Sequence, residues 1–334
     1  MLTASELETI TSHVGLVDRS DRVRLEISGP DRAKFLHNLT TNDIKRLTVG
    51  RGCEAFVTSP QGKTIGYLIL LAAEEKVIAR ADPGGDALAL PHFRKYGVFD
   101  DVSIDDHSSA TFELHLFGHQ SAVLAQRACG RLPEAEYSHL LTEIGGNLVR
   151  LIREAPAVGL GFTVIGERPA VGTVKERLLE HGRDLALIEV DAASFDLFRI
   201  EAGTPVFGKE ITEKNLPQEF GRDDRAINFV KGCYLGQETV ARIDALGHVN
   251  QLLKGFRFEP GSPCPEPGSP LEHEGKRVGV ITSSAFSPLR NSAVGLGLVR
   301  TTHNAPGTRL SVTLLEGTGR ARSIVCDLPM IDRA

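Results

Sequence analysis

The stretch KGCYLGQETVARI, from Lys231 to Ile243, holds the residues best placed to do chemistry. It puts Cys233 just after a lysine and just before a predicted helix that starts at Gly236. The unpaired N–H groups of a helix N-terminus and the charge of Lys231 both favour a thiolate over a thiol. Cys233 is therefore a candidate reactive thiol. The alternative is a small buried filler, because free cysteine is among the most buried residue types.

Gln237 and Glu238 fall in the first turn of the same predicted helix. One interpretation is that they line a pocket beside Cys233. The other is that Glu238 only complements the helix dipole and pairs with Arg242, four residues further on.

Composition narrows the classes of protein that this chain can represent. Its 334 residues suggest two or three domains, and its net charge of -5 argues against a general nucleic-acid binder. The five cysteines include no CxxC pair, so we expect neither a disulfide framework nor a bound metal. The N-terminus lacks the pattern of a signal peptide, and the longest apolar run, LILLAA, is too short to span a bilayer. We expect a cytoplasmic monomer that binds neither membranes nor nucleic acid.

The first half of the chain alternates between strand and helix patterns. RVRLEIS has the period of a half-buried strand, and Asp31 is predicted to cap a helix after it. AFVTSPQGKTIGYLILL predicts a hairpin, and HQSAVLAQRACG predicts a helix that ends at Gly130. Antiparallel hairpins mixed with helices indicate an α+β fold rather than a doubly wound parallel sheet.

The second half repeats this pattern and then changes. Asp191 is predicted to cap the helix in DAASFDLFRIEAG, which ends at Gly203. After Asn250 the chain is rich in Pro, Gly and short β-like segments, as in a small β-barrel. We therefore expect residues 1–246 to form two α+β lobes and residues 247–334 to form a barrel.

The motif around Cys233 resembles that of a known protein family. KGCYLGQE, followed by Arg242, resembles the signature of the YgfZ-type folate-binding proteins, which are relatives of the glycine-cleavage T-protein. The resemblance covers nearly the whole chain. It includes the segments SGPDRAKFLHNLTTNDI, FRIEAGTPVFGKEI, GVITSSAFSP and AVGLGLVR.

The resemblance implies a three-lobed ring of two α+β lobes and a β-barrel around a central channel for tetrahydrofolate. Glu201 takes the position of the glutamate that accepts the pterin N–H groups. Lys231 is the first candidate to meet the carboxylates of the folate tail. Arg199 is the second candidate; the alternative is that it only pairs with a neighbouring carboxylate. Asn42 lies in a Thr-Asn-Asp turn that either lines the channel or merely ends a helix.

One departure from the T-protein bears on activity. The T-protein reads Gly-Gly-x-x-Asp-Asp-Leu where this chain has GKTIGYL, so its two aspartates fall on Gly66 and Tyr67. The first of the two is the catalytic aspartate, so we do not expect glycine-cleavage activity. The chain also lacks the tryptophan that some YgfZ proteins place at the folate.

The resemblance implies a folate-dependent accessory protein for iron–sulfur cluster assembly or repair. Its partners would be client enzymes, including radical enzymes that modify tRNA, and Cys233 would be the working thiol. Because such clusters usually take four protein ligands, any cluster at Cys233 would be shared or transient. Whether the thiol meets iron, other thiols or a one-carbon adduct stays open. The alternatives are a tetrahydrofolate-dependent aminomethyltransferase and a non-catalytic folate sensor or scaffold.

Overall fold

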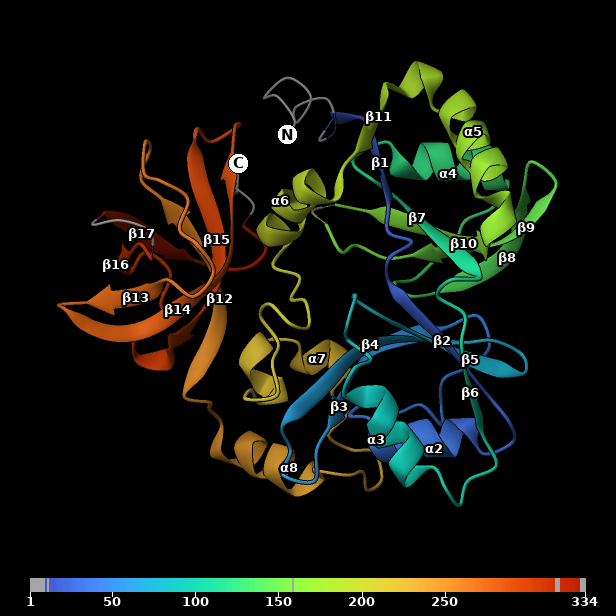
Figure 1. Ribbon diagram of the computed structural model, residues 1–334, viewed down its shortest axis with the longest axis horizontal. Coiled ribbons are helices and arrows are strands. Elements are labelled where there is room, and N and C mark those ends of the chain that lie inside the picture. The colour runs from blue at the N-terminus through green and yellow to red at the C-terminus, as the bar shows by residue number, and fades with distance from the viewer. Residues whose placement is uncertain (1–9, 11, 158, 316–318, 331–334) are drawn as a thin grey trace.

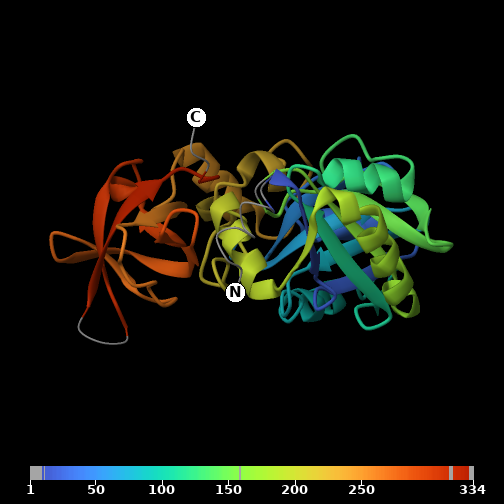
Figure 2. The ribbon, with the colours of Figure 1, turned by 90° about the horizontal axis from the view of Figure 1, so that it is seen from above.

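Figure 1 shows two sheet-and-helix lobes and a barrel, joined by a helical segment. The structure is a computed structural model that describes residues 10, 12–157, 159–315 and 319–330. Seen from above, the barrel lies beside the lobes, so the three bodies form one flattened layer (Figure 2). The α+β expectation and the C-terminal barrel are both confirmed.

The first lobe is an antiparallel five-stranded sheet in the order β3-β4-β5-β2-β6. Two helices pack against it and bury Phe35 and Phe93 in its core. Its elements are β2 (Val23–Ser28), α2 (Arg32–Leu39), β3 (Gly52–Thr58), β4 (Thr64–Ala72), β5 (Lys76–Ala81), α3 (Ala89–Tyr96) and β6 (Ser103–Asp106). The predicted cap was wrong: Asp31 makes no side-chain cap, and its carboxylate instead accepts the Asp101 N–H at 3.1 Å.

The second lobe is a six-stranded sheet in the order β11-β1-β7-β10-β9-β8, in which only β1 and β11 run parallel. The first of the described strands, β1, thus belongs to the second lobe. Its elements are β1 (Val14–Asp18), β7 (Thr111–Phe117), α4 (Ser121–Cys129), β8 (His139–Ile144), β9 (Asn147–Arg153), β10 (Gly161–Glu167), α5 (Val171–His181) and β11 (Leu187–Val190). Helix α4 ends as predicted, because Gly130 takes a φ of 75° and donates its N–H to Gln126 O.

A helical segment leads from the second lobe to the barrel. It comprises α6 (Ala192–Ala202), a 3-10 turn (Pro217–Phe220), α7 (Asp223–Ala226) and α8 (Gln237–Leu246). Both predicted ends of α6 are confirmed: Asp191 accepts the Ser194 N–H at 2.7 Å, and Gly203 has a φ of 75°. Helix α6 contacts β1 of the second lobe and β14 and β15 of the barrel, so it joins the two bodies.

The barrel closes through six strands in the order β12-β15-β14-β13-β16-β17, and β12 pairs with both β15 and β17. Its strands are β12 (Gln251–Phe258), β13 (Pro270–His273), β14 (Lys276–Ser287), β15 (Ser292–Arg300), β16 (Arg309–Thr313) and β17 (Arg320–Cys326). Among the described residues, no helix has the length and apolar character needed to cross a membrane.

A buried ion-pair network joins the two lobes. Arg80, on β5 of the first lobe, is fully buried and contacts two carboxylates of the second lobe. Its guanidinium donates to Glu113 on β7 at 2.7 and 3.1 Å, and to Glu154 after β9 at 2.8 and 2.9 Å. Although burial alone would raise them, Arg80 and Arg22 hold the pKa values of both carboxyls below their usual range, that of Glu113 at about 2.

Candidate functional site

The loop that carries Cys233 is fastened to the end of α2. The Lys231 ammonium donates to the carbonyl oxygens of His37, Thr40 and Asn42 at 2.5, 2.6 and 2.8 Å. These three bonds use all three of its N–H donors. Burial lowers the pKa of Lys231 to about 7, whereas the carbonyl oxygens and the ring of Tyr234, 4.7 Å away, stabilise the charged form.

The other end of the loop is fastened too. Leu235 donates its N–H to Asn38 O at 2.9 Å and accepts the Thr58 hydroxyl at 2.6 Å. Gly236 must be glycine, because its φ is 86° and an added Cβ would lie 2.4 Å from Ser59 O. The predicted helix follows as α8, and its Gln237 side chain accepts the Tyr234 N–H at 3.2 Å.

Cys233 itself is exposed on this fastened loop. Among the other cysteines, Cys129 is buried, Cys53 and Cys326 are half-buried, and Cys264 is exposed. Burial raises the pKa of Cys53 and of Cys129 to about 12, which keeps both as thiols. The predicted alternative of a buried filler at 233 was therefore wrong.

Two other predicted site residues, Asn42 and Glu238, lie near this loop. Asn42 Nδ2 donates to the carbonyl oxygens of Glu54 and Arg225, each at 2.8 Å, which ties the turn to α7. Glu238 is exposed in the first turn of α8. The N–H donors of Lys231 and Asn42 already bond to backbone carbonyl oxygens of the protein. Contact of these two side chains with folate stays a prediction.

Glu201 and Arg199 lie elsewhere, on α6 (Figure 1), so the structure does not bring them to Lys231. Arg199 is buried and donates to Asp196, Glu210 and Ser283, which fastens α6 to the barrel. Its contact with folate also stays a prediction.

Glu201 is paired with Arg290 of the barrel at 3.2 Å, and burial raises its pKa despite that partner. It lines a cavity of about 250 Å³ together with Phe117, Phe198 and His119.

The two lobes and the segment after α6 meet at a small central cavity of about 30 Å³. This volume holds one or two water molecules. Side chains narrow this central space, among them Tyr67, Tyr137 and Arg222.

A buried carboxylate that the sequence analysis missed organises these side chains. Glu54, on β3, is fully buried and accepts the hydroxyls of Tyr67 and Tyr137, each at 2.6 Å. It also pairs with Arg222 at 3.0 Å and with Arg225 at 2.6 Å. Burial, with help from Glu54, raises the pKa of both tyrosines well above the usual value, so both phenols stay protonated donors.

Gly66 and Tyr67, which stand where the T-protein has its two aspartates, lie on opposite faces of β4. A Cβ added to Gly66 would meet Ala89 of α3 at 3.0 Å and Val57 at 3.2 Å, so position 66 faces the core of the first lobe. Tyr67 faces the central cavity, as alternation along a strand requires. Neither position brings a carboxylate to the centre.

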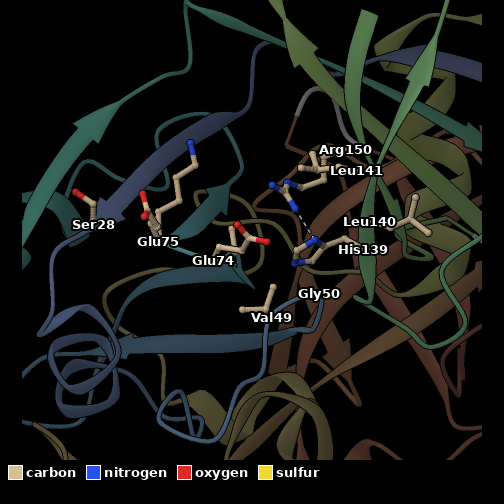
Figure 3. Close-up of a pocket in the computed structure, with 11 residues that line it drawn as sticks. Ser28, Val49, Gly50, Glu74, Glu75, His139, Leu140, Leu141 and Arg150 are labelled. Carbon is tan, nitrogen blue, oxygen red and sulfur yellow. Dashed lines mark hydrogen bonds between the residues drawn. The ribbon is translucent and has the colours of Figure 1, made fainter.

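A separate cleft of about 520 Å³ lies between the lobes, on residues that belong to no motif (Figure 3). Glu74 and Glu75 line it from the first lobe, and His139 and Arg150 line it from the second. Burial, followed by Arg150, lowers the pKa of His139 to about 4, so its ring accepts the Arg150 N–H at 2.7 Å. Within the described residues, no group of three or more His, Cys, Asp or Glu side chains is placed to hold a metal ion.

Comparison with known proteins gives the same architecture. Residues 1–231 match the GCVT N-terminal domain, and residues 252–332 match the glycine cleavage T-protein C-terminal barrel domain. A putative chloroplastic transferase of Arabidopsis thaliana is 28% identical over 309 residues, covering 92% of this chain and 70% of the relative. An aminomethyltransferase of Rubrobacter xylanophilus is 28% identical over 297 residues, covering 88% and 78%.

Among solved structures, the glycine cleavage system aminomethyltransferase T of Bartonella henselae superposes with a TM-score of 0.85. It is 20% identical, and the match covers 99% of this chain and 90% of that one, which shows a shared fold. Because the first family model spans more than half of the sequence, the chain belongs to the family of the GCVT N-terminal domain, with the T-protein barrel domain following it.

Proposed function

We propose that this protein is a YgfZ-type, folate-dependent accessory protein that assists the assembly or repair of iron–sulfur clusters in client enzymes. Cys233 is its working thiol. The observation that carries the proposal is the placement of this cysteine: exposed, on a loop fastened at both ends, directly before α8. A thiol held in this way is accessible to a partner and pre-positioned for it.

The surface beside Cys233 supports a protein partner. Val230 is 90% exposed and Phe229 is 41% exposed, immediately before the Lys-Gly-Cys sequence. Exposed apolar side chains next to a functional group are typical of a docking site. A client enzyme that covers them would bring its own cluster or thiols to Cys233.

The chemistry of the Glu201 cavity suits a pterin. The rings of Phe117 and Phe198 offer apolar faces to a flat heterocycle, and the carboxylate can accept two adjacent N–H groups. A bound tetrahydrofolate would supply one-carbon chemistry. By contrast, the central cavity does not fit a pterin in this arrangement of Tyr67, Tyr137 and Arg222.

Complementation tests the proposal. The chain is expressed in a strain that lacks its own YgfZ, and cluster-dependent thiomethylation of tRNA is measured. We expect thiomethylation to be restored, whereas a genuine T-protein expressed at the same level should not restore it. Failure of the folded, expressed chain to restore the modification would contradict the proposed function.

The names of the relatives favour a second candidate, an aminomethyltransferase. Glycine-cleavage turnover with tetrahydrofolate and a lipoyl carrier protein decides between the two. We expect turnover at least about 100-fold below that of a T-protein, because positions 66 and 67 lack the carboxylate that would manage the proton.

A further inference from the structure

An imidazole–carboxylate pair lies under the Cys233 loop. His37, near the end of α2, is only 4% exposed, and its Nδ1 lies 3.1 Å from Asp43 Oδ1. Apart from Asp43, this nitrogen has no polar partner within the described residues. A carboxylate at Nδ1 favours the tautomer in which that nitrogen carries the proton, so that Nε2 is left as an acceptor.

The other ring nitrogen, Nε2, lies beside the loop that carries Cys233. A Cβ built on Gly232 would lie 3.7 Å from His37 Nε2, the nearest described atom outside Gly232 and its two chain neighbours. Cys233 is the next residue, one Cα–Cα step of about 3.8 Å further along the chain. Hydrogen bonds from Lys231 to His37 O and from Leu235 to Asn38 O anchor the loop on either side of Cys233. Among the described residues no hydrogen bond joins Cys233 Sγ to His37 Nε2, so proton transfer requires the exposed Cys233 side chain to turn towards the ring.

We propose that His37 is the general base for Cys233 and that Asp43 orients its ring. This inference rests on the proposed role of Cys233 as the working thiol. When an electrophile approaches, the proton on Cys233 Sγ passes to His37 Nε2, which leaves a thiolate and an imidazolium. Asp43 then faces the new positive charge through Nδ1–H. The arrangement follows the logic of a nucleophile, a base and an orienting group.

The charges around His37 determine its resting state. Burial lowers its pKa, the charges of Lys231 and Lys45 lower it further, and Asp43 opposes them. Asp43 is itself shared with Arg46 at 3.6 Å. The imidazole is therefore neutral at pH 7 and able to accept a proton, as a general base must be.

The test is the pH dependence of alkylation of the full-length protein. Iodoacetamide labelling of Cys233 is followed by peptide mass spectrometry from pH 5.5 to 8.5, in wild type, His37→Gln and Asp43→Asn. Cys264, the other exposed thiol, is the internal control in every sample. Wild-type Cys233 should lose less than about threefold in rate between pH 8 and 6.5. In His37→Gln, the rate should fall about tenfold per pH unit below 8 and be at least about tenfold below wild type at pH 6.5.

Further readouts separate a base from a merely structural role. Added imidazole should restore the Cys233 rate in His37→Gln, and Asp43→Asn should lie between the other two proteins. Cys264 should be unchanged throughout. If wild-type Cys233 already follows the tenfold slope, or if His37→Gln keeps the wild-type profile, the proposal is overturned; the wild-type profile decides even where a variant does not fold. Because alkylation needs neither folate nor a client, its outcome is independent of the complementation assay.

Discussion

Replacing Arg80 with methionine should break the buried ion pairs between the two lobes and lower the free energy of unfolding. Methionine keeps much of the length of arginine but removes the guanidinium that donates four bonds of 2.7 to 3.1 Å to Glu113 and Glu154. Both carboxylates are almost completely buried and would lose their principal partner. Breaking a buried pair in this way costs about 3–5 kcal/mol of unfolding free energy.

Urea unfolding followed by circular dichroism measures this loss. Arg177→Met is the matched control, since Arg177 pairs with Glu180 at 2.8 Å on the surface and should cost less than about 1 kcal/mol. The deficit of Arg80→Met should also shrink at pH 5, because unpaired buried carboxyls take up protons more readily than paired ones. A loss of unfolding free energy below about 1 kcal/mol at pH 7, or a loss that does not change with pH, would show that the Arg80 ion pairs do not hold the lobes together.

Three further results are expected. Burial lowers the pKa of His115 to about 3, so the folded protein binds fewer protons than the unfolded chain between pH 3 and 6.5. The free energy of unfolding should therefore fall as the pH falls through this window, by about 2 kcal/mol from pH 7 to 5. In urea titrations at several pH values, His115→Gln should remove this part of the pH dependence. Glu201→Ala should weaken reduced-folate binding by at least about 1.5 kcal/mol in calorimetry, whereas the exposed Glu176→Ala should not, and equal affinities would remove Glu201 from the site. Val230→Ser should lower complementation without changing thermal stability, unlike Leu148→Ser on β9, and full activity would show that clients dock elsewhere.

Local signals predicted much of the fold. Gly130 and Gly203 end their helices in the left-handed conformation, and Asp191 caps α6, because each depends only on neighbouring residues. The barrel was also predictable, because its short strands and its glycine- and proline-rich turns follow one another locally after Asn250. Asp31 was the exception, since a loop 70 residues away took its carboxylate.

The site was less predictable, because its contacts join distant parts of the chain. Arg80 meets Glu154 across 74 residues, and Lys231 meets His37 across 194. Strand alternation placed Gly66 and Tyr67 on opposite faces, but only the packing of the lobes showed which face meets the centre. His37 was visible within FLHNLTTND, yet nothing nearby in the sequence connects it with Cys233.

Single cysteine variants test whether Cys233 is the working thiol, by comparing two exposed thiols in the strain that lacks YgfZ. Cys233→Ala and Cys264→Ala are expressed at equal levels, and thiomethylated tRNA is quantified against wild type and an empty vector. We expect Cys264→Ala to restore the modification as wild type does, whereas Cys233→Ala should stay at the level of the empty vector. Restoration by Cys233→Ala to the wild-type level would contradict it, and would favour a folate sensor or scaffold that needs no thiol.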